Sequence, residues 1–301
     1  MNTPLLTIGL PVYNARPYLE DTLRSIFAQT FQDWELVIFD DGSTDGSGAF
    51  LERVKDPRIR MLGSKRNRGL AAALNLINDE ARGQYIARMD ADDVMHPERM
   101  SRQFAFLERC PEVDVLGCSL VSVGRHGEPR GARVFPAGHE AITQASIAGP
   151  RLCHATVMAR TSWWRRFRYR EQNRGCEDLE LWMAAQSSSR FANLPDLLYY
   201  YREYSSFSLP KYVLNRARSA GLAWHVRDRG MARAAADIAG HMARAGLYVI
   251  ATGLGLRDQL IARRSEPLSL EQQEGYRAAL ARVRATPLPD VQKLDIQQNA
   301  Q

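Results

Sequence analysis

Residues 5–47 read LLTIGLPVYNARPYLEDTLRSIFAQTFQDWELVIFDDGSTDGS. Two short apolar runs, 5–10 and 35–39, enclose residues 17–28, whose apolar side chains recur at helical spacing. A strand, a helix and a second strand in this order form a βαβ unit, in which the two strands lie parallel in one sheet. This stretch therefore predicts an α/β fold.

The alternation of strands and helices continues from this unit as far as residue 123. The expected helices are 47–54, 70–81 and 97–108, and the expected strands are 59–62, 85–89 and 113–123. Such a series predicts a mainly parallel sheet flanked by helices. In sheets of this kind ligands bind outside the carboxyl ends of the strands, so polar residues that directly follow a strand are the first candidates for a site.

The rest of the chain divides by composition. Residues 124–138 are rich in glycine and proline and are predicted to be a loop between two halves, 1–123 and 124–208, of one domain. After Ser208 the pattern becomes helical and rich in alanine and arginine, so residues 209–301 are predicted to be a helical, basic C-terminal extension. The second half is expected to hold a helix at 140–148, a strand at 152–159, a basic and aromatic loop at 163–174, a helix at 178–185 and a strand ending at 199–201.

The formal charge of +6 over 301 residues is concentrated in one segment. Residues 211–264 hold ten basic and three acidic residues, a net charge of +7. A basic segment favours contact with an anionic surface such as lipid head groups, although a solvated helix face, an appendage packed on the domain or a dimer interface would have the same composition. The most apolar window, 245–256, is shorter than the roughly 20 residues of a spanning helix, so the expectation is peripheral contact with an anionic membrane.

Cysteine usage and the N-terminus predict the compartment. The four cysteines form no CxxC pair and are too few for a disulfide framework, which indicates reducing conditions. No basic region precedes an apolar run at the N-terminus, since the first basic residue is Arg16, so no secretory signal is predicted. We therefore expect a cytoplasmic protein, with its membrane contact on the inner face of the cytoplasmic membrane.

Two polar clusters follow the first two predicted strands. PVYN, residues 11–14, supplies an aromatic ring that can stack on a base, and DDGSTDGS, residues 40–47, supplies two carboxylates that suit a ribose or a base edge. Ordinary turn and helix-capping roles explain the same residues equally well. Because the carboxyl ends of parallel strands meet at one edge, the two clusters are expected to lie together.

Three carboxylates, Asp90, Asp92 and Asp93, follow the strand predicted at 85–89. Like charges this close raise one another's pKa, and a hard divalent cation relieves the repulsion. Mg²⁺ is commonly held by one or two carboxylates and by substrate phosphates, so the cluster predicts a Mn²⁺ or Mg²⁺ site that receives a diphosphate. A solvated acidic turn is the alternative.

A fourth cluster, Glu177 and Asp178, opens a predicted helix. Acidic residues are common in a first helical turn because they interact favourably with the helix dipole. An ionised carboxylate in a cleft is also a suitable general base for an acceptor hydroxyl. The two residues alone leave both interpretations open.

Taken together and in this order, the motifs resemble those of family 2 glycosyltransferases with the GT-A fold. The resemblance spans residues 5–204 and fades after Ser208. It implies a GT-A catalytic domain, 1–208, in which residues 1–123 bind a nucleotide sugar and residues 124–208 bind the acceptor. The motifs that carry it are residues 11–47, NRGLAAALN at 67–75, GQYIARMDADDVMHPERM at 83–100, CHATVMAR at 153–160 and CEDLELW at 176–182.

The resemblance also assigns roles. In similar enzymes the aromatic of the first motif and the second aspartate of the DDGSTD motif hold the uracil of a UDP-sugar, which maps onto Tyr13 and Asp41. Asp92, with Asp90, matches the DxD metal pair. Asp178 matches the general base, and Glu177 is the second candidate. The expected donor-binding residues are Pro11, Tyr13, Asn14, Asp40, Asp41, Asn67, Gly69, Asp90, Ala91 and Asp93.

The acceptor prediction centres on the loop at 163–174, WWRRFRYREQNR, which is more basic and aromatic than is usual for such enzymes. Arginine binds phosphate bidentately and aromatic rings stack, so an anionic or carbohydrate acceptor is expected there. A partly buried tryptophan in a surface loop and a satisfied core histidine are the alternatives. The predicted acceptor-binding residues are His154, Trp163, Arg165 and Trp182.

The sequence thus predicts an inverting, metal-dependent glycosyltransferase that moves a sugar from a UDP-sugar to a cell-surface glycan, a lipopolysaccharide or a lipid-linked saccharide, with oligomerisation left open. A sugar nucleotidyltransferase would share the fold, but residues 9–14 lack its glycine-rich, basic phosphate loop. A nucleic-acid-binding protein would explain the basic extension, but no recognition motif is present and the acidic cluster at 90–93 would repel phosphates without a metal. No nucleic-acid partner is therefore expected.

Overall fold

One mixed sheet runs through the computed structural model, which describes residues 3–124, 126–144, 152–172, 174–203, 208–225 and 231–289. Its strand order is β3-β2-β1-β4-β8-β6-β9-β5, and β7 pairs with β6 outside this path. The strands are β1 (Leu6–Val12), β2 (Trp34–Asp40), β3 (Ile59–Gly63), β4 (Tyr85–Arg88), β5 (Val94–Met95), β6 (Val115–Val123), β7 (Pro129–Arg133), β8 (Met158–Arg160) and β9 (Phe191–Arg202).

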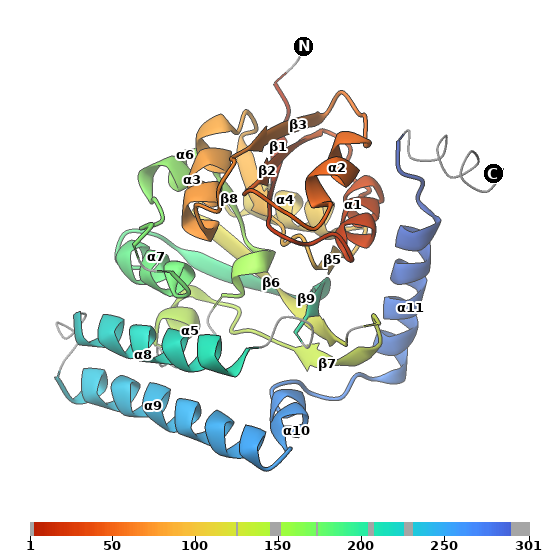
Figure 1. Ribbon diagram of the computed structural model, residues 1–301. Helices are drawn as coiled ribbons and strands as arrows, with labels where there is room; N and C mark the ends of the chain where they lie inside the picture. The colour runs from red at the N-terminus through yellow and green to blue at the C-terminus, as the bar shows by residue number, and fades with distance from the viewer. Residues whose placement is uncertain are drawn as a thin grey trace.

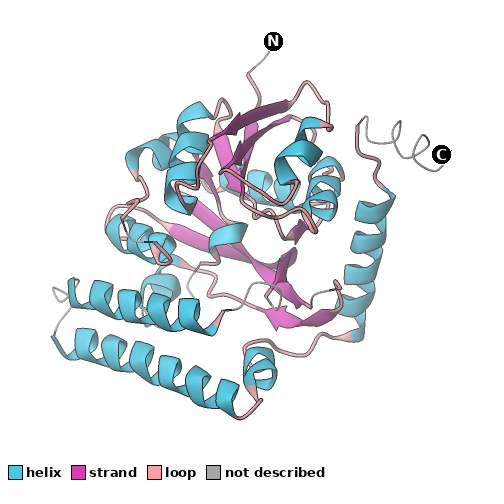
Figure 2. Cartoon of the chain, viewed as in Figure 1, coloured by secondary structure: helices cyan, strands magenta, loops and turns pink. Residues whose placement is uncertain are grey.

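Helices surround this sheet, as Figure 2 shows with helices in cyan and strands in magenta. The predicted α/β architecture is confirmed, and most predicted elements agree with the observed ones to within a few residues. The α-helices are α1 (Leu19–Phe27), α2 (Ser47–Glu52), α3 (Leu70–Glu80), α4 (Arg99–Arg109), α5 (His139–Gln144), α6 (Thr161–Arg166), α7 (Glu177–Ala185), α8 (Leu209–His225), α9 (Met231–Gly253), α10 (Arg257–Ala262) and α11 (Leu270–Ala285).

The first four strands of the chain, β1 to β4, alternate with helices and form the parallel part of the sheet. β1 lies between β2 and β4 and is parallel to both, and β3 extends the sheet beyond β2. Every residue of β1 is buried, as expected for a parallel strand that is covered by helices on both faces. The register pairs Val12 with Asp40, so β1 and β2 end side by side at one edge.

The second half of the sheet is antiparallel where β8 joins β4 to β6. Here the predicted loop at 124–138 is wrong, because it contains β7, which pairs antiparallel with β6. The glycine signal belongs to the hairpin turn, where Gly127 has a φ of +80°. Gly131, inside β7, is needed because a Cβ there would lie 2.7 Å from the Glu266 carbonyl oxygen. The predicted division at residue 123 therefore falls inside a β-hairpin.

Two further predictions in this half need correction. The strand expected at 152–159 is a 3-10 helix at His154–Thr156 followed by the short strand β8. The basic and aromatic loop expected at 163–174 begins inside α6, because Trp163 and Trp164 are buried and give that segment a helical apolar face. The predicted helix at 140–148 is α5, and residues 145–148 lie outside the described residues.

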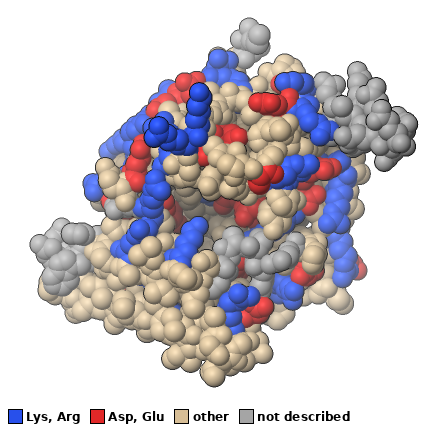
Figure 3. All heavy atoms as spheres, in the orientation of Figure 1, with Lys and Arg blue, Asp and Glu red and all other residues tan. Residues whose placement is uncertain are grey.

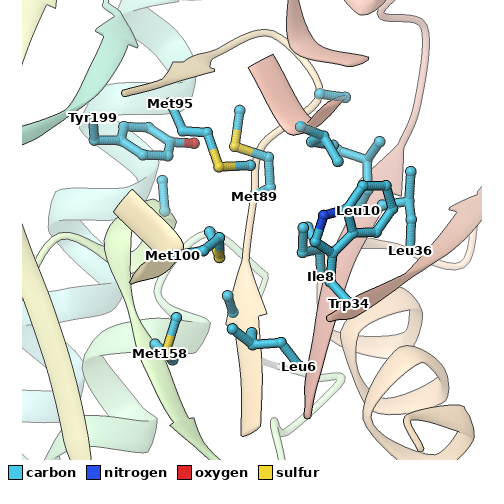
Figure 4. Packing of buried hydrophobic residues seen from close by; sticks show 14 of the residues in the cluster. Leu6, Ile8, Leu10, Trp34, Leu36, Met89, Met95, Met100, Met158 and Tyr199 are labelled. Carbon is cyan, nitrogen blue, oxygen red and sulfur yellow. The ribbon is translucent and has the colours of Figure 1, made fainter. Parts of the chain in front are cut away.

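The largest buried cluster supports the carboxyl edge of the parallel strands. Figure 4 shows Leu6, Ile8 and Leu10 of β1 packed with Trp34 and Leu36 of β2 and with methionines from neighbouring segments. Tyr199 of β9 belongs to the same cluster, and its hydroxyl accepts a hydrogen bond from the Asp90 backbone N–H at 3.1 Å. The apolar core therefore fixes the turn that follows β4.

The C-terminal helices are not separate from this sheet. Figure 1 shows α8 and α9 side by side below the sheet and α11 along its flank. Tyr276 and Val283 of α11 are buried in one cluster with Val121 of β6 and Tyr200 of β9, and the ring centroids of Tyr200 and Tyr276 lie 4.7 Å apart. Removing the chain after Ser208 would expose this cluster, so a truncation could not test the predicted membrane contact of the extension without also disturbing the fold.

Replacing Tyr276 by alanine is expected to lower the free energy of unfolding by about 3 to 5 kcal/mol, the usual cost of deleting a buried aromatic side chain. Leu270→Ala on the same helix is the matched control, because Leu270 is 79% exposed and its loss should cost at most about 0.5 kcal/mol. Urea unfolding followed by tryptophan fluorescence measures both. Equal stability of the two variants would show that α11 is not part of the core.

Candidate active site

Four segments that carry the candidate residues converge on the carboxyl edge of β1, β2 and β4. The loop after β1 is tied to the loop after β2, because Asn14 Oδ1 accepts a hydrogen bond from the Thr44 N–H at 2.8 Å. Asn14 itself has a φ of +51°, which asparagine tolerates better than most residues. Tyr13 beside it is 51% exposed, and Pro11 lies within β1 opposite Phe39. The predicted proximity of the PVYN and DDGSTDGS motifs is therefore confirmed.

Asp41 is buried and its carboxylate holds another loop. Oδ1 accepts from the Arg68 N–H and Oδ2 from the Gly69 N–H, both at 2.8 Å. Gly69 has a φ of +97°, where a side chain would be strained. The structure thus gives Asp41 a loop-holding role that the sequence did not predict. Asp40, whose Oδ1 accepts from the Ser43 N–H at 3.0 Å, is more exposed.

Asn67 lies on the outer side of this loop. Its side chain is exposed, two residues before Gly69 and next to Arg68, both of which are anchored to Asp41. The NRG sequence therefore lies between β3 and α3 in the chain, and Asp41 ties it to the loop after β2. This position keeps Asn67 among the residues around the carboxyl edge.

The three carboxylates after β4 form one compact group. Single oxygen atoms from Asp90, Asp92 and Asp93 all lie within 4.8 Å of one another. Burial and the Asp90 charge raise the pKa of Asp92 to about 6, and burial with its two neighbours raises the pKa of Asp93. Repulsion among converging hard oxygen ligands is the condition that a divalent cation relieves, so these residues fit a Mn²⁺ or Mg²⁺ ion.

The three carboxylates are not equivalent. Both oxygens of Asp90 face Arg88, with Nη2 to Oδ1 at 2.7 Å and Nη1 to Oδ2 at 3.1 Å. Asp93 Oδ1 accepts from the Arg202 N–H at 2.7 Å. Asp92 accepts from Arg202 Nη1 at 2.8 Å through its backbone oxygen, so its carboxylate takes part in neither of these two interactions. This geometry favours Asp92 over Asp90 as the metal ligand. Ala91, between them, is buried.

Sequence reasoning missed Arg88 and Arg202, the two arginines that hold this turn. Both side chains are buried, and Arg202 also pairs with Asp21 of α1 at 2.7 Å. A signal for Arg88 was present, because an arginine inside a fully buried strand needs a carboxylate partner. Arg202 lies about 110 positions from the acidic turn, and no pattern in the sequence around it indicated a contact with that turn.

Glu177 and Asp178 begin α7 beside the same buried arginine. Burial raises the pKa of Asp178, Glu177 raises it further and the Arg88 charge opposes the rise. Arg88 is therefore close enough to act on Asp178 while it pairs with Asp90. The predicted base and the predicted metal cluster therefore lie within electrostatic range of one guanidinium group. Glu177 is buried, whereas Asp178 is partly exposed.

His154 and Trp182 of α7, both predicted to bind the acceptor, lie close to each other. His154 Nε2 is 2.7 Å from the Tyr169 hydroxyl, and its ring stands 6.1 Å from Trp182 in an edge arrangement. Burial and, to a lesser degree, Arg88 lower the pKa of His154 well below its usual range, so the ring is neutral at pH 7. Trp182 is only 3% exposed, so its ring is packed inside the protein and does not offer an open surface for stacking.

The acceptor contacts predicted for Trp163 and Arg165 are not supported by their positions. Trp163 is 5% exposed, packs against Trp164 and Trp182, and donates from Nε1 to Ser189 Oγ at 2.9 Å. Arg165 Nη2 donates to the Ala81 carbonyl at 2.9 Å, at the end of α3. The sequence pattern did not distinguish a basic, aromatic surface loop from a short helix with a buried aromatic side, which is what the chain forms.

This face of the molecule is hollowed near its centre, between the parallel strands above and the α8–α9 pair below (Figure 3). Acidic and basic side chains both border the hollow, whereas the surface over α8 and α9 is mainly uncharged. The arrangement can bind an anionic ligand through a cation at the Asp90–Asp93 turn. It can also accept a proton at Asp178.

Comparison with known proteins identifies a family model and several relatives that match this chain. The model of the family described as Glycosyl transferase family 2 matches residues 7–176. EpsE of Bacillus subtilis, which is named as a glycosyltransferase, is 35% identical over 207 residues, which cover 66% of this chain and 73% of EpsE. TuaG of Bacillus subtilis, named for teichuronic acid biosynthesis, is 37% identical over 122 residues, 40% of this chain and 48% of TuaG.

Solved structures share the fold. The crystal structure of Staphylococcus aureus TarS residues 1–349 with UDP has a TM-score of 0.60 and 21% identity, covering 92% of this chain and 79% of the TarS chain. PcManGT of Pyrobaculum calidifontis, a mannosyltransferase solved with GDP-Man and Mn²⁺, has a TM-score of 0.60 and 18% identity, covering 95% and 88%. The predicted GT-A fold is thereby confirmed.

Proposed function

The chain belongs to glycosyl transferase family 2, and we propose that it transfers a sugar from a UDP-sugar to an acceptor hydroxyl with inversion at the anomeric carbon. The observation that carries the proposal is the position of Arg88, which pairs with Asp90 of the acidic turn and acts on Asp178 at the start of α7. The turn proposed for the metal-bound diphosphate and the proposed base therefore lie within electrostatic range of the same arginine.

On the donor side we assign the base and ribose to the loops after β1 and β2. Tyr13, half exposed, offers a ring for stacking, and Asp40 offers a carboxylate for a ribose hydroxyl. Asp41 supports this region by holding the 67–69 loop. The UDP in TarS and the GDP-Man in PcManGT agree with a nucleotide donor.

We assign the diphosphate to the Asp90–Asp93 turn, with Asp92 as the metal ligand. A bound Mn²⁺ or Mg²⁺ would neutralise charge on the departing diphosphate. Arg202 donates from Nη1 to the Asp92 carbonyl and from its backbone N–H to the Asp93 carboxylate, and Arg88 neutralises Asp90. Asp92 is then left to face the ligand.

On the acceptor side Asp178 takes the proton from the attacking hydroxyl. A single displacement, in which the acceptor oxygen attacks opposite the leaving diphosphate, inverts the configuration and needs one base. The test is a panel of nucleotide sugars assayed for nucleoside diphosphate release, with the anomeric configuration of the product read by NMR. Retention of configuration would contradict the proposed mechanism, and no diphosphate release from any donor would contradict the function.

We also propose that the protein contacts the surface of an anionic membrane through α9. The side of α9 turned away from α8 carries no charged residue whose side chain is described, whereas Asp237, His241 and Tyr248 on the other side are buried. None of the described helices is long and apolar enough to cross a bilayer. Basic residues at Arg244, Arg257 and Arg263 suit anionic head groups. The exposed apolar and small residues of this face include Ala232, Ala235, Ala239, Met242, Ala243, Gly246 and Ile250, and the exposed Leu254 follows directly after the helix.

Vesicles of phosphatidylglycerol and phosphatidylcholine should therefore sediment with the protein at low salt and lose it at high salt. Replacing Ile250 and Leu254, 62% and 67% exposed, by glutamate should weaken this binding at least about tenfold, since each buried side chain contributes about 1.5 to 3 kcal/mol. Val134→Glu is the control, because Val134 is 55% exposed and lies outside α9. Absence of vesicle binding, together with a dimer that the double variant abolishes, would assign the face to a second copy.

A further inference from the structure

α8, the first helix of the C-terminal extension, packs beside the segment that leads to Glu177 and Asp178. A Cβ atom at Gly175 would overlap the side-chain amide of Asn215, so α8 packs directly on the backbone that leads into α7. Arg218 of α8 donates from Nη1 to the Arg174 carbonyl in the same segment. Figure 1 shows α8 below α7 in agreement with these contacts. This part of the site is built by residues beyond the segment that matches the family model, 7–176.

Arg174 lies between this segment and the loop held by Asp41. A Cβ atom at Gly69 would be 3.4 Å from the guanidinium carbon of Arg174, and Arg174 Nη2 donates to the Arg68 carbonyl at 3.1 Å. Glycine at position 69 therefore leaves room for the guanidinium group. Arg174 is thus fixed close to both the donor-side loop and the start of α7, which carries the proposed base.

The two guanidinium groups keep their charge uncompensated. Among the residues that the structure describes, no carboxylate lies within 4.0 Å of Arg174 or Arg218, and both side chains are exposed. Other arginines of the same segment are paired, since Arg168 binds Asp79 at 2.5 Å and Arg170 lies 3.2 Å from Glu180. Uncompensated arginines beside a reaction site, where paired ones are available nearby, favour an anionic ligand.

We propose that Arg174 and Arg218 form an anion subsite for the acceptor, and that the acceptor carries a phosphate group near its reacting hydroxyl. The inference rests on the proposed glycosyl transfer. Two exposed, planar guanidinium groups suit bidentate contacts to phosphate oxygens. The acceptor is the favoured ligand because Arg218 lies outside the family-matched segment, whereas the donor diphosphate is assigned to the turn at 90–93. The phosphate belongs either to a lipid-linked saccharide or to a soluble or polymeric phosphate ester.

Calorimetry on the full chain saturated with UDP and Mg²⁺ tests the subsite, with glycerol 3-phosphate as the probe. We expect a saturable site for the probe that weakens at least about tenfold in the Arg174→Gln, Arg218→Gln double variant, because charge-assisted hydrogen bonds are lost. UDP affinity should stay within about twofold of the wild type. Arg168→Gln, in the same segment but paired with Asp79, should bind the probe normally. The exposed positions of both arginines limit the effect on folding, which thermal unfolding checks.

Three outcomes would overturn the proposal. Wild-type protein that binds UDP but not the probe lacks the subsite, and unchanged probe affinity in the double variant places the subsite elsewhere. A parallel loss of UDP and probe affinity assigns the arginines to the donor. Wild-type protein that binds no UDP would instead contradict the proposed function. Competition by phosphatidic acid vesicles would identify a lipid-borne phosphate, and its absence would identify a soluble or polymeric one.

Discussion

Asp178→Asn is expected to lower the rate of sugar transfer by about 10² to 10⁴ while leaving UDP affinity within about twofold of the wild type. Asparagine keeps the size of the side chain but cannot accept the proton of the attacking hydroxyl. The acidic turn that is assigned to the diphosphate lies in another segment and is held by Arg88 and Arg202, which the substitution leaves in place. Steady-state transfer rates and calorimetric UDP titrations give the two readouts.

Glu177→Gln is the matched control, because it removes the neighbouring carboxylate of the same helical turn. Glu177 is buried, so its loss should have a smaller effect on transfer than the loss of the more exposed Asp178. Near-normal turnover of Asp178→Asn with an inactive Glu177→Gln would move the base by one residue. Activity of both variants would leave the pair with only a helix-terminal role.

The pH profile offers an independent check on Asp178. Burial and Glu177 raise the pKa of Asp178, so its ionised fraction falls at a higher pH than for an exposed aspartate. Because the base acts in its ionised form, kcat/KM should rise with pH through this pKa and then level off. Asp178→Asn should lose that acidic limb. An unchanged limb in the variant would assign it to another group.

Removing the divalent metal is expected to weaken UDP binding by about 10²-fold or more, and Asp92→Ala should reproduce this loss in the presence of Mn²⁺. The reason is electrostatic, since three carboxylates within 4.8 Å of one another repel a diphosphate unless a cation lies between them. Calorimetric titration of UDP with Mn²⁺, and separately with EDTA, measures the effect.

Two variants sharpen the metal test. Asp79→Asn removes a surface carboxylate that pairs with Arg168 away from the acidic turn, so it should bind UDP as the wild type does. Asp90→Asn should have a smaller effect than Asp92→Ala, because Asp90 is already neutralised by Arg88. Equal UDP affinity with and without metal, or an unaffected Asp92→Ala variant, would remove the metal from the mechanism.

The sequence was sufficient for the parallel half of the fold and for the members of the carboxyl-edge cluster. Strand and helix periods within residues 5–123 are local signals, and the rule that parallel strands end at one edge brings PVYN, DDGSTDGS and DADD together. The Asn14–Thr44 hydrogen bond is the result. The later half was harder, because β7 is short and rich in glycine and proline and resembles a loop in composition.

Tertiary structure alone decided which charged residues are paired and which face outward. Arg202 reaches Asp92 across about 110 positions, and α8 brings Arg218 to Arg174. Arg88 pairs with Asp90 and acts electrostatically on Asp178. Trp163 and Arg165 looked like acceptor ligands by composition, but Trp163 is buried among other aromatic rings, and the exposed Arg165 donates to the Ala81 carbonyl. Sequence patterns record local periodicity, whereas the burial of a side chain and the partner of a charge depend on segments that meet only after folding. The convergence of the motifs at this sheet edge could therefore be predicted from the sequence, but the partner of each charged residue could not.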